Sequence, residues 1–193
     1  MESTARRRSS TSREAILAAA YELLLEKGLE DLTVEGIAAR AGVGKQTIYR
    51  WWPSKGAVAV EAFAERSVPG LAFPDTGDLR ADLTAMLTAL AARLADPDFG
   101  PHAAALMAGA LHDPALARSF REVVFAPVRA AYLERIAAAR QRGELRADVT
   151  DDDLLDAAFG PLWFLRLNDP DRLTGASGAT IAGIVLDGAR PPT

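Results

Sequence analysis

The 193-residue sequence contains no cysteine, which excludes disulfide bonds and thiol chemistry. It has two histidines, His102 and His112, whereas a zinc site needs three or four ligands, so we expect no metal and no catalytic triad. No run of about 18 apolar residues is present to span a membrane. The early arginines are not followed by the apolar segment of a secretory signal. We therefore expect a cytoplasmic protein that needs no cofactor.

Lysine is also scarce, and its distribution is uneven. The three lysines, Lys27, Lys45 and Lys55, lie in the first 55 residues, where nine Lys or Arg stand against seven Asp or Glu, a net charge of +2. The remaining residues carry 13 basic and 19 acidic side chains, a net charge of −6. A mildly basic N-terminal segment followed by an acidic remainder suggests that the N-terminal segment contacts a polyanion.

Stretches that alternate polar and apolar residues, as half-buried strands do, are absent, whereas Ala, Leu and Arg are abundant. With 49% hydrophobic and 25% charged residues, the chain can bury a core. The composition predicts an all-α protein.

The first helix signal is a capping box. Thr11 and Glu14 have its spacing, and apolar residues at helical periodicity follow until Gly28, which predicts the end of the helix. We expect residues 1–10 to form a disordered arm before this helix.

Two shorter helices are predicted next. Thr33 is suited to cap a helix that ends at Gly42. A third helix is expected from about Lys45 to Trp51, because the residue before Pro53 avoids the helical region. Three short helices, the last two joined by Ala-Gly-Val-Gly, are typical of a helix-turn-helix unit.

A fourth, linking helix is predicted from about Ser54 to Ser67. The stretch SVPGLAFPDTGD at 67–78, with two prolines and two glycines, then marks a break and a domain boundary. A C-terminal helical bundle follows, which gives about nine helices in all. Asp-Pro, Arg-Gly and Asn-Asp-Pro turns separate its helices, expected at about 78–95, 99–111, 114–142, 151–167 and 176–189.

The stretch GVGKQTIYRWWPSK carries more polar and aromatic side chains than a short core helix would. Gly44-Lys45 looks like the end of a phosphate-binding loop, but that loop needs a glycine and a hydroxyl residue where Ala39 and Gln46 stand. A helix in the major groove of DNA needs donors and acceptors near its N-terminus instead. Lys45, Gln46 and Thr47 supply them.

Groups that flank this helix can hold DNA phosphates: Thr33, Tyr49, Arg50, Trp51 and Lys55. Ile48 and Trp52 are four residues apart and share one face, so we expect both to pack inward while Tyr49 and Trp51 point outward. The alternative for the whole segment is a structural three-helix cap that binds no DNA.

At these residues the sequence resembles the TetR family of bacterial transcriptional repressors. The likeness covers about 50 contiguous residues, and beyond them it is limited to the number and length of the helices. The shared pattern is Ile16, Ala19-Ala20, Leu23, Gly28, Leu32-Thr33-Val34, Ile37-Ala38, Ala41-Gly42-Val43, Thr47-Ile48-Tyr49, Trp52 and Ser54-Lys55.

The resemblance implies two sets of contacts with operator DNA. Phosphates are assigned to Thr33, Tyr49 and Lys55, and base edges to Lys45, Gln46 and Thr47. Two positions depart from the family pattern. Gly44 stands where Ser is usual, which removes a hydroxyl cap. Gly56 lies in the first turn of the linking helix, where Gly lowers helix stability by up to about 1 kcal/mol relative to Ala. We therefore expect the first turn of this helix to open easily.

Large apolar side chains recur at helical spacing in the later helices, and core packing alone would explain them. The resemblance implies, in addition, a pocket for a small ligand, and helical bundles line such pockets with similar residues. Lining and core stay open as alternatives for each residue. The candidate lining residues are Met86, Leu90, Met107, Phe120, Val124, Tyr132, Phe159 and Trp163.

One short recognition helix reads few bases, so specific binding requires two copies held about 34–36 Å apart, and therefore a homodimer. The resemblance assigns the interface to the last two helices, where small residues recur at helical spacing. The candidate interface residues are Leu155, Ala179, Ala182, Gly183 and Leu186.

We therefore predict a helix-turn-helix DNA-binding domain at 1–55 and a ligand-binding and dimerisation domain at 56–193. The predicted function is a transcriptional repressor that a small, largely apolar inducer releases from double-stranded operator DNA, without enzymatic activity. Two alternatives stay open. One is a helical adaptor of the same fold, regulated by a protein partner or by no ligand. The other is an enzyme with an apolar cavity.

Overall fold

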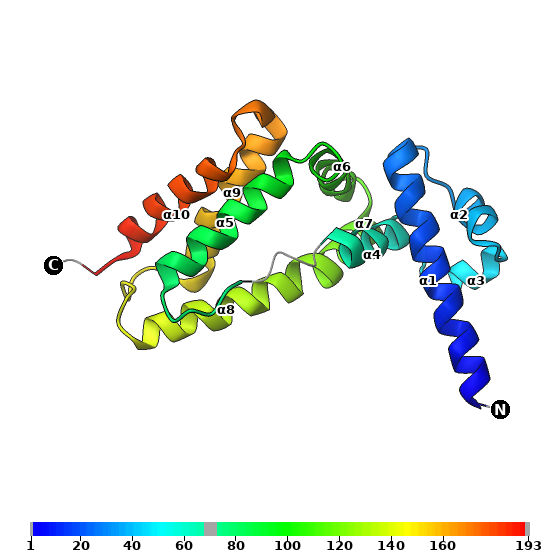
Figure 1. Ribbon diagram of the computed structural model, residues 1–193, viewed down its shortest axis with the longest axis horizontal. Coiled ribbons are helices and arrows are strands. Elements are labelled where there is room, and N and C mark those ends of the chain that lie inside the picture. Colours follow the sequence, from blue (N-terminus) through cyan, green and yellow to red (C-terminus); the bar gives the residue numbers. More distant parts are fainter. Residues whose placement is uncertain (1, 68–72, 192–193) are drawn as a thin grey trace. The chain divides into compact units, whose positions relative to one another are not determined.

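The computed structural model describes residues 2–67 and 73–191, with side chains from Ser10 onward (Figure 1). All regular structure in these ranges is helical, which confirms the predicted all-α class. Within the same ranges, no helix is both long enough and apolar enough to cross a membrane.

The chain divides into two compact units, and the division differs from the expected functional boundary at residue 55. Unit 1 comprises Met1–Pro69 and His102–Phe125, and unit 2 comprises Gly70–Pro101 and Ala126–Thr193. The linking helix and two later helices therefore belong with the helix-turn-helix. The predicted break at 67–78 contains the passage from unit 1 to unit 2, and its residues 68–72 lie outside the described part of the chain.

Helix α1 spans Glu2–Lys27, so it begins nine residues before the expected start at Thr11 and includes the residues expected to form a disordered arm. Extending an existing helix costs far less than starting one, and Arg and Glu favour helical backbone, which explains the longer helix. The inner face is as predicted, with Ile16 and Leu24 fully buried. Gly28 follows the helix with a φ of 78°.

Helix α2, Val34–Ala41, has the predicted cap, because the Thr33 hydroxyl oxygen accepts a hydrogen bond from the Gly36 amide at 3.0 Å. It ends at Gly42, whose φ of 66° is the left-handed conformation that glycine adopts without strain. Helix α3, Lys45–Tyr49, ends two residues earlier than expected. The amide of Trp51 donates to the Ile48 carbonyl at 2.9 Å, a three-residue bond that tightens the chain after the helix.

Helix α4, Lys55–Ser67, begins after Ser54, whose hydroxyl oxygen accepts a hydrogen bond from the Ala57 amide at 3.2 Å. Gly56 in its first turn is buried against a helix of the same unit. A Cβ at Gly56 would lie 3.0 Å from Leu116 Cδ1 and 3.3 Å from Leu116 Cβ. This glycine therefore permits close packing, a reason for its presence that the sequence did not indicate.

The rest of unit 1, His102–Phe125, contains most of α6, Gly100–Ala110, and all of α7, Pro114–Phe120. The single helix expected at 114–142 is divided: α7 runs into a π-helical turn, Arg121–Phe125, and then into α8, Ala126–Gln141. Pro127 has no amide hydrogen, so it cannot donate the helical hydrogen bond to the carbonyl four residues earlier. The wider turn just before it accommodates the lost hydrogen bond.

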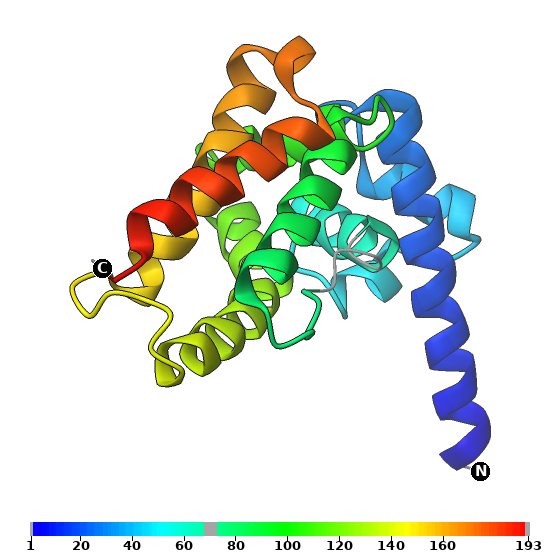
Figure 2. The ribbon, with the colours of Figure 1, turned by 60° about the vertical axis from the view of Figure 1, so that its left-hand side comes forward.

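Unit 2 is built from α5, Leu79–Ala95, with α8, α9, Asp151–Asn168, and α10, Gly175–Ala189. The ends of α5, α9 and α10 agree with the predicted ends within one residue. Helix α10 lies along α5, as both ribbon views show (Figures 1 and 2). The approach is close, because a Cβ at Gly178 would lie 2.2 Å from the carbonyl oxygen of Leu87.

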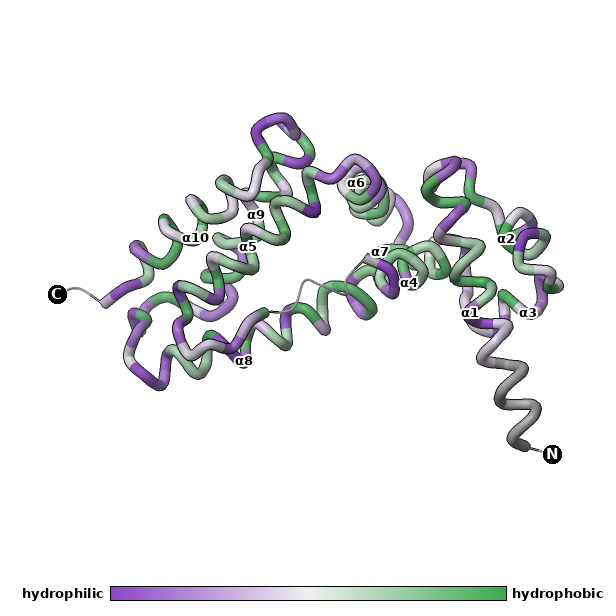
Figure 3. The backbone as a smooth tube through the Cα atoms, viewed as in Figure 1, coloured by the Kyte–Doolittle hydropathy of each residue, from purple (hydrophilic) through white to green (hydrophobic). Residues whose placement is uncertain are grey.

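Helix α9 begins as its sequence predicts. The Thr150 hydroxyl oxygen accepts a hydrogen bond from the Asp153 amide at 3.0 Å, and Asp151, Asp152 and Asp153 occupy the first turn, where carboxylates favour the helix dipole. The turn from α9 to α10 contains a 3-10 helix, Pro170–Arg172, and is strongly hydrophilic (Figure 3).

Candidate functional site

The N-terminal turn of α3 presents the residues predicted to read bases. Lys45 and Gln46 are exposed and Thr47 is half-buried, whereas Ile48, the next residue, is fully buried. Gly44 stands at the N-cap, so the first turn of α3 has no side-chain cap. One short helix thus anchors itself through Ile48 and leaves donors and acceptors accessible on its other side.

The aromatic residues at the end of α3 and just after it separate as predicted. Tyr49 is 53% exposed and Trp51 is 44% exposed, while Trp52 is buried. The Arg50 guanidinium lies 5.8 Å from the centre of the Trp51 ring, a cation–π contact that the sequence did not suggest. This exposed pair joins a positive charge to a flat apolar surface beside the recognition helix.

Thr33 and Lys55, predicted to contact phosphates, also have structural roles. The Thr33 hydroxyl accepts the capping bond of α2 and keeps its own hydrogen for donation. The Lys55 ammonium donates to the carbonyl of Glu30 at 2.8 Å and to that of Leu29 at 3.3 Å. An ammonium has three hydrogens, so one is left for a phosphate while Lys55 ties the start of α4 to the loop after α1.

Lys45 has an acidic neighbour that the sequence analysis missed. Its ammonium lies 3.0 Å from the Glu35 carboxylate on α2, and both side chains are exposed. The hydrogen bond from Lys45 lowers the pKa of Glu35, and the same bond raises the pKa of Lys45. Glu35 therefore competes with DNA for this ammonium. Ten residues separate the two, and only knowledge of how α2 and α3 meet would have revealed the pair.

A second missed acid is Glu61 on α4. Its carboxylate accepts the indole N–H of Trp52 at 2.5 Å and also pairs with Arg13 of α1. The sequence predicted that Trp52 packs inward but gave no sign of its polar partner, which lies nine residues further along the chain.

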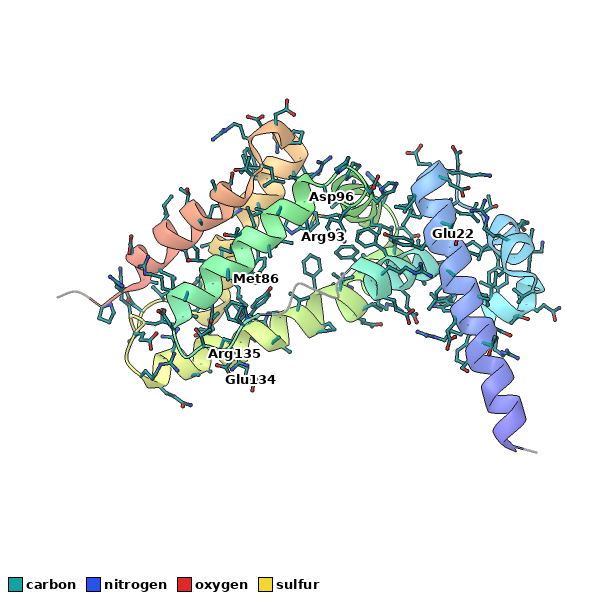
Figure 4. All side chains as sticks on the ribbon, viewed as in Figure 1. Glu22, Met86, Arg93, Asp96, Glu134 and Arg135 are labelled. Carbon is teal, nitrogen blue, oxygen red and sulfur yellow. The ribbon has the colours of Figure 1, made fainter. Side chains whose placement is uncertain are left out.

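The candidate pocket residues fall in both units. Met107, Phe120 and Val124 belong to unit 1, whereas Met86, Leu90, Tyr132, Phe159 and Trp163 belong to unit 2. Met86 on α5 (Figure 4) is almost completely buried, and Leu90 lies one turn further along the same helix. Core packing and pocket lining therefore stay open for these residues.

Tyr132 on α8 is the centre of an aromatic cluster in unit 2. Its ring centroid lies 4.7 Å from that of Phe73, with the rings edge to face, and 4.8 Å from that of Phe159. Burial raises the pKa of the Tyr132 hydroxyl. The segment bearing Phe73 is further held to α8, where Arg135 (Figure 4) pairs with Asp75 at 2.6 Å.

Unit 2 also contains an open cavity of about 520 Å³, at the start of α5 and the end of α10. Leu79, Leu145 and Leu186 contribute apolar surface to it, and Arg80 and Arg190 contribute charge. None of the candidate pocket residues lines this cavity.

The candidate dimer-interface residues separate into two groups. Leu155, Ala182 and Leu186 are buried within the single chain, so they are not on a free surface as expected. The small residues of α10 on this face serve packing against α5 instead, as Gly178 shows. Ala179 is exposed, and a Cβ at Gly183 would meet nothing within 4 Å.

Other apolar residues of these two helices, which the sequence analysis did not select, are exposed. Phe164 of α9 is 65% exposed, Ile184 of α10 is 69% exposed, and Leu167 of α9 is also exposed.

An exposed five-residue helix, anchored by Ile48 and Trp52 after a capped partner helix, is the arrangement of a helix-turn-helix DNA-binding protein. Comparison with known proteins agrees. Residues 16–62 match the family model for bacterial regulatory proteins, tetR family, and residues 73–185 match that for the tetracyclin repressor-like C-terminal domain. The chain belongs to the TetR family of DNA-binding transcriptional regulators.

Individual relatives support this assignment. The chain is 36% identical over 168 residues to the uncharacterized HTH-type transcriptional regulator YdeS of Bacillus subtilis (strain 168), covering 87% of this chain and 84% of that protein. It is 30% identical over 155 residues to the DNA-binding transcriptional repressor TetR of Mycobacteroides abscessus, covering 78% and 80%. The crystal structure of the TetR family transcription regulator SCO0332 shares 37% identity and a TM-score of 0.79, covering 93% of this chain and 99% of that chain.

Proposed function

We propose that this protein is a cytoplasmic repressor that binds a two-part operator as a homodimer and leaves it when a small, largely apolar ligand binds. The observation that carries the DNA-binding part is the composition of α3. Its N-terminal end, where major-groove helices contact base edges, leaves Lys45, Gln46 and Thr47 accessible. The buried side chain of Ile48 anchors the helix to the rest of the domain.

Exposed apolar residues support the homodimer. The single chain exposes three large apolar side chains of α9 and α10 to solvent: Phe164, Leu167 and Ile184. Pairing α9 and α10 with the same helices of a second copy would bury them. Ala179 and Gly183 add small side chains that permit close helix approach. A dimer also places two α3 helices for simultaneous contact with two half-sites.

The aromatic cluster around Tyr132 supports a ligand site in unit 2. Ligand pockets combine apolar walls with a few polar groups, and the hydroxyl of the buried Tyr132 is such a group. A ligand that binds the DNA-incompetent state more tightly would release the operator.

A gel-shift experiment with the DNA upstream of the protein's own coding region tests this function, after native mass spectrometry has identified a co-purified compound. We expect a shift that this compound reverses. A shift that no compound reverses would favour the adaptor, and turnover of the compound would favour the enzyme. The absence of any shift with specific DNA would contradict the proposal.

A further inference from the structure

One carboxylate in unit 1 connects three elements around the recognition helix. Glu61 of α4 accepts the indole N–H of Trp52 at 2.5 Å through Oε2, and its Oε1 accepts a hydrogen bond from Arg13 of α1. Trp52 in turn follows α3, and its amide donates to the Ile48 carbonyl at 3.0 Å. Glu61 thus holds the C-terminal side of the recognition helix to both α1 and α4.

The chemistry of this position requires two acceptor oxygens. Both partners of Glu61 are donors, a guanidinium on one oxygen and an indole N–H on the other. A glutamine at residue 61 would offer one acceptor oxygen and one NH2 group, which is a donor. One of the two donors, Arg13 or Trp52, would then face the NH2 group and lose its hydrogen bond. The Trp52 ring is buried, which makes an unpaired indole N–H there costly.

We propose that Glu61 is a positioning residue that sets the orientation of α3 for reading bases, an inference that rests on the proposed DNA binding. Base-edge hydrogen bonds tolerate little displacement of the helix, whereas long Lys and Arg side chains reach phosphates from a range of positions. Loss of Glu61 therefore lowers sequence discrimination more than it lowers general affinity for DNA.

Glu65 provides a matched control on the same helix, one turn later. It pairs with Arg13 at 2.9 Å, as Glu61 pairs with the other guanidinium nitrogen. The Glu65 side chain is 45% exposed against 24% for Glu61, and it makes no bond to Trp52. Glu65→Gln removes a similar charge and a similar ion pair without touching the recognition helix.

The test compares Glu61→Gln with Glu65→Gln on two duplexes: one that the wild-type protein selects from a random-sequence library, and a scrambled version of it. For Glu61→Gln we expect about a tenfold loss of affinity for the selected duplex, the order expected for one lost hydrogen bond to a charged group, and less than about a twofold change on the scrambled one. For Glu65→Gln we expect less than about a twofold change on either duplex.

The NMR signal of the Trp52 indole N–H gives a readout that does not depend on DNA. It should move to the position of a weakly bonded indole in Glu61→Gln and stay in place in Glu65→Gln. Trp52→Phe, which keeps an aromatic ring but lacks the N–H, should reproduce the loss of discrimination and serves if Glu61→Gln does not fold.

Equal effects of the two glutamine variants on discrimination, or an unchanged Trp52 signal in Glu61→Gln, would overturn the inference. If the wild-type protein selects no sequence from the library, the proposed function fails instead. In that case the NMR comparison still decides whether Glu61 holds Trp52.

Discussion

Gly178 of α10 packs directly on the backbone of Leu87 of α5, where a Cβ would lie 2.2 Å from the carbonyl oxygen. Ala182 and Leu186 lie one and two turns further along the same face, and both are buried. Of the residues that suggested a dimer interface on α10, Ala182 and Leu186 therefore hold unit 2 together. An interface on α10 must use its opposite face, which bears Ile184.

This arrangement predicts which substitutions separate the subunits. Phe164→Glu and Ile184→Glu place a charge on an exposed face, so each should give a folded monomer with unchanged helical content. Leu111→Glu is the control, because Leu111 of unit 1 is also highly exposed and lies outside α9 and α10. Light scattering and circular dichroism measure both properties. A dimeric Ile184→Glu variant would place the interface elsewhere.

Ala182→Glu, by contrast, should lower the free energy of unfolding by more than about 3 kcal/mol, because it buries an unpaired carboxylate.

The second prediction concerns base reading. Gln46→Ala and Thr47→Ala should each weaken binding to the selected duplex by about 1–3 kcal/mol and leave binding to scrambled DNA nearly unchanged. Arg50→Ala should weaken both and reduce the salt dependence of binding by about one unit of slope. Arg50 is a cleaner phosphate probe than Lys55, which also bonds two carbonyls. Fluorescence titrations at several salt concentrations check this, and equal losses on both duplexes for all three variants would refute the division of roles.

Glu35 should restrain DNA binding through Lys45. We expect Glu35→Gln to bind the selected duplex more tightly at neutral pH, because the Lys45 ammonium is then free for base edges. In a Lys45→Ala background the same change should gain less, and a double-mutant cycle measures the difference. An equal gain in both backgrounds would show that Glu35 acts through general repulsion alone.

The same ion pair predicts a pH dependence. Because Lys45 lowers the pKa of Glu35, the pair is complete above the ordinary pKa of a glutamate and is lost as the pH falls through the lowered value. The midpoint of Glu35 in an NMR titration should therefore rise in Lys45→Ala.

The fourth prediction concerns Gly56. Helix propensity alone would make Gly56→Ala stabilising by up to about 1 kcal/mol. The structure predicts a net loss, because the new methyl would press on Leu116, which is itself buried and lies equally close to Gly109. Gly188→Ala in α10, where a Cβ would meet nothing within 4 Å, should be neutral or stabilising. Urea unfolding of both variants checks the contrast, and a gain of stability in Gly56→Ala would show that Leu116 moves aside.

Tyr132→Phe tests the ligand site. Phenylalanine keeps the ring that packs on Phe73 and Phe159 and removes only the hydroxyl, so the melting temperature and the DNA affinity should stay nearly unchanged. Release of DNA by the co-purified compound should weaken, because the ligand loses a hydrogen-bonding group. Thermal unfolding and titration of the protein–DNA complex with the compound measure these effects. An unfolded variant, or an unaltered response to the compound, would assign Tyr132 to the core.

Several helix ends were predictable because glycine and hydroxyl caps mark them locally, whereas the start of α1, the end of α3 and the division of the helix expected at 114–142 were not. Thr33, Gly42 and Thr150 act as their residue types suggest. The exposed side of α3 followed from the four-residue spacing of Ile48 and Trp52 in the same way.

Contacts between distant positions were not predictable. The periodicity of α10 showed small residues at helical spacing but not that Gly178 packs on the backbone of Leu87 in α5. The acids that pair with Lys45 and Trp52 are identified only once the helices meet.

The ratio of affinities for the selected and the scrambled duplex, measured for the wild-type protein at one salt concentration, tests the central claim most directly. The account predicts a selected site made of two half-sites, bound by one dimer and preferred by at least about a thousandfold over the scrambled duplex. A ratio near one would contradict sequence-specific recognition by α3, however tightly the protein bound either DNA.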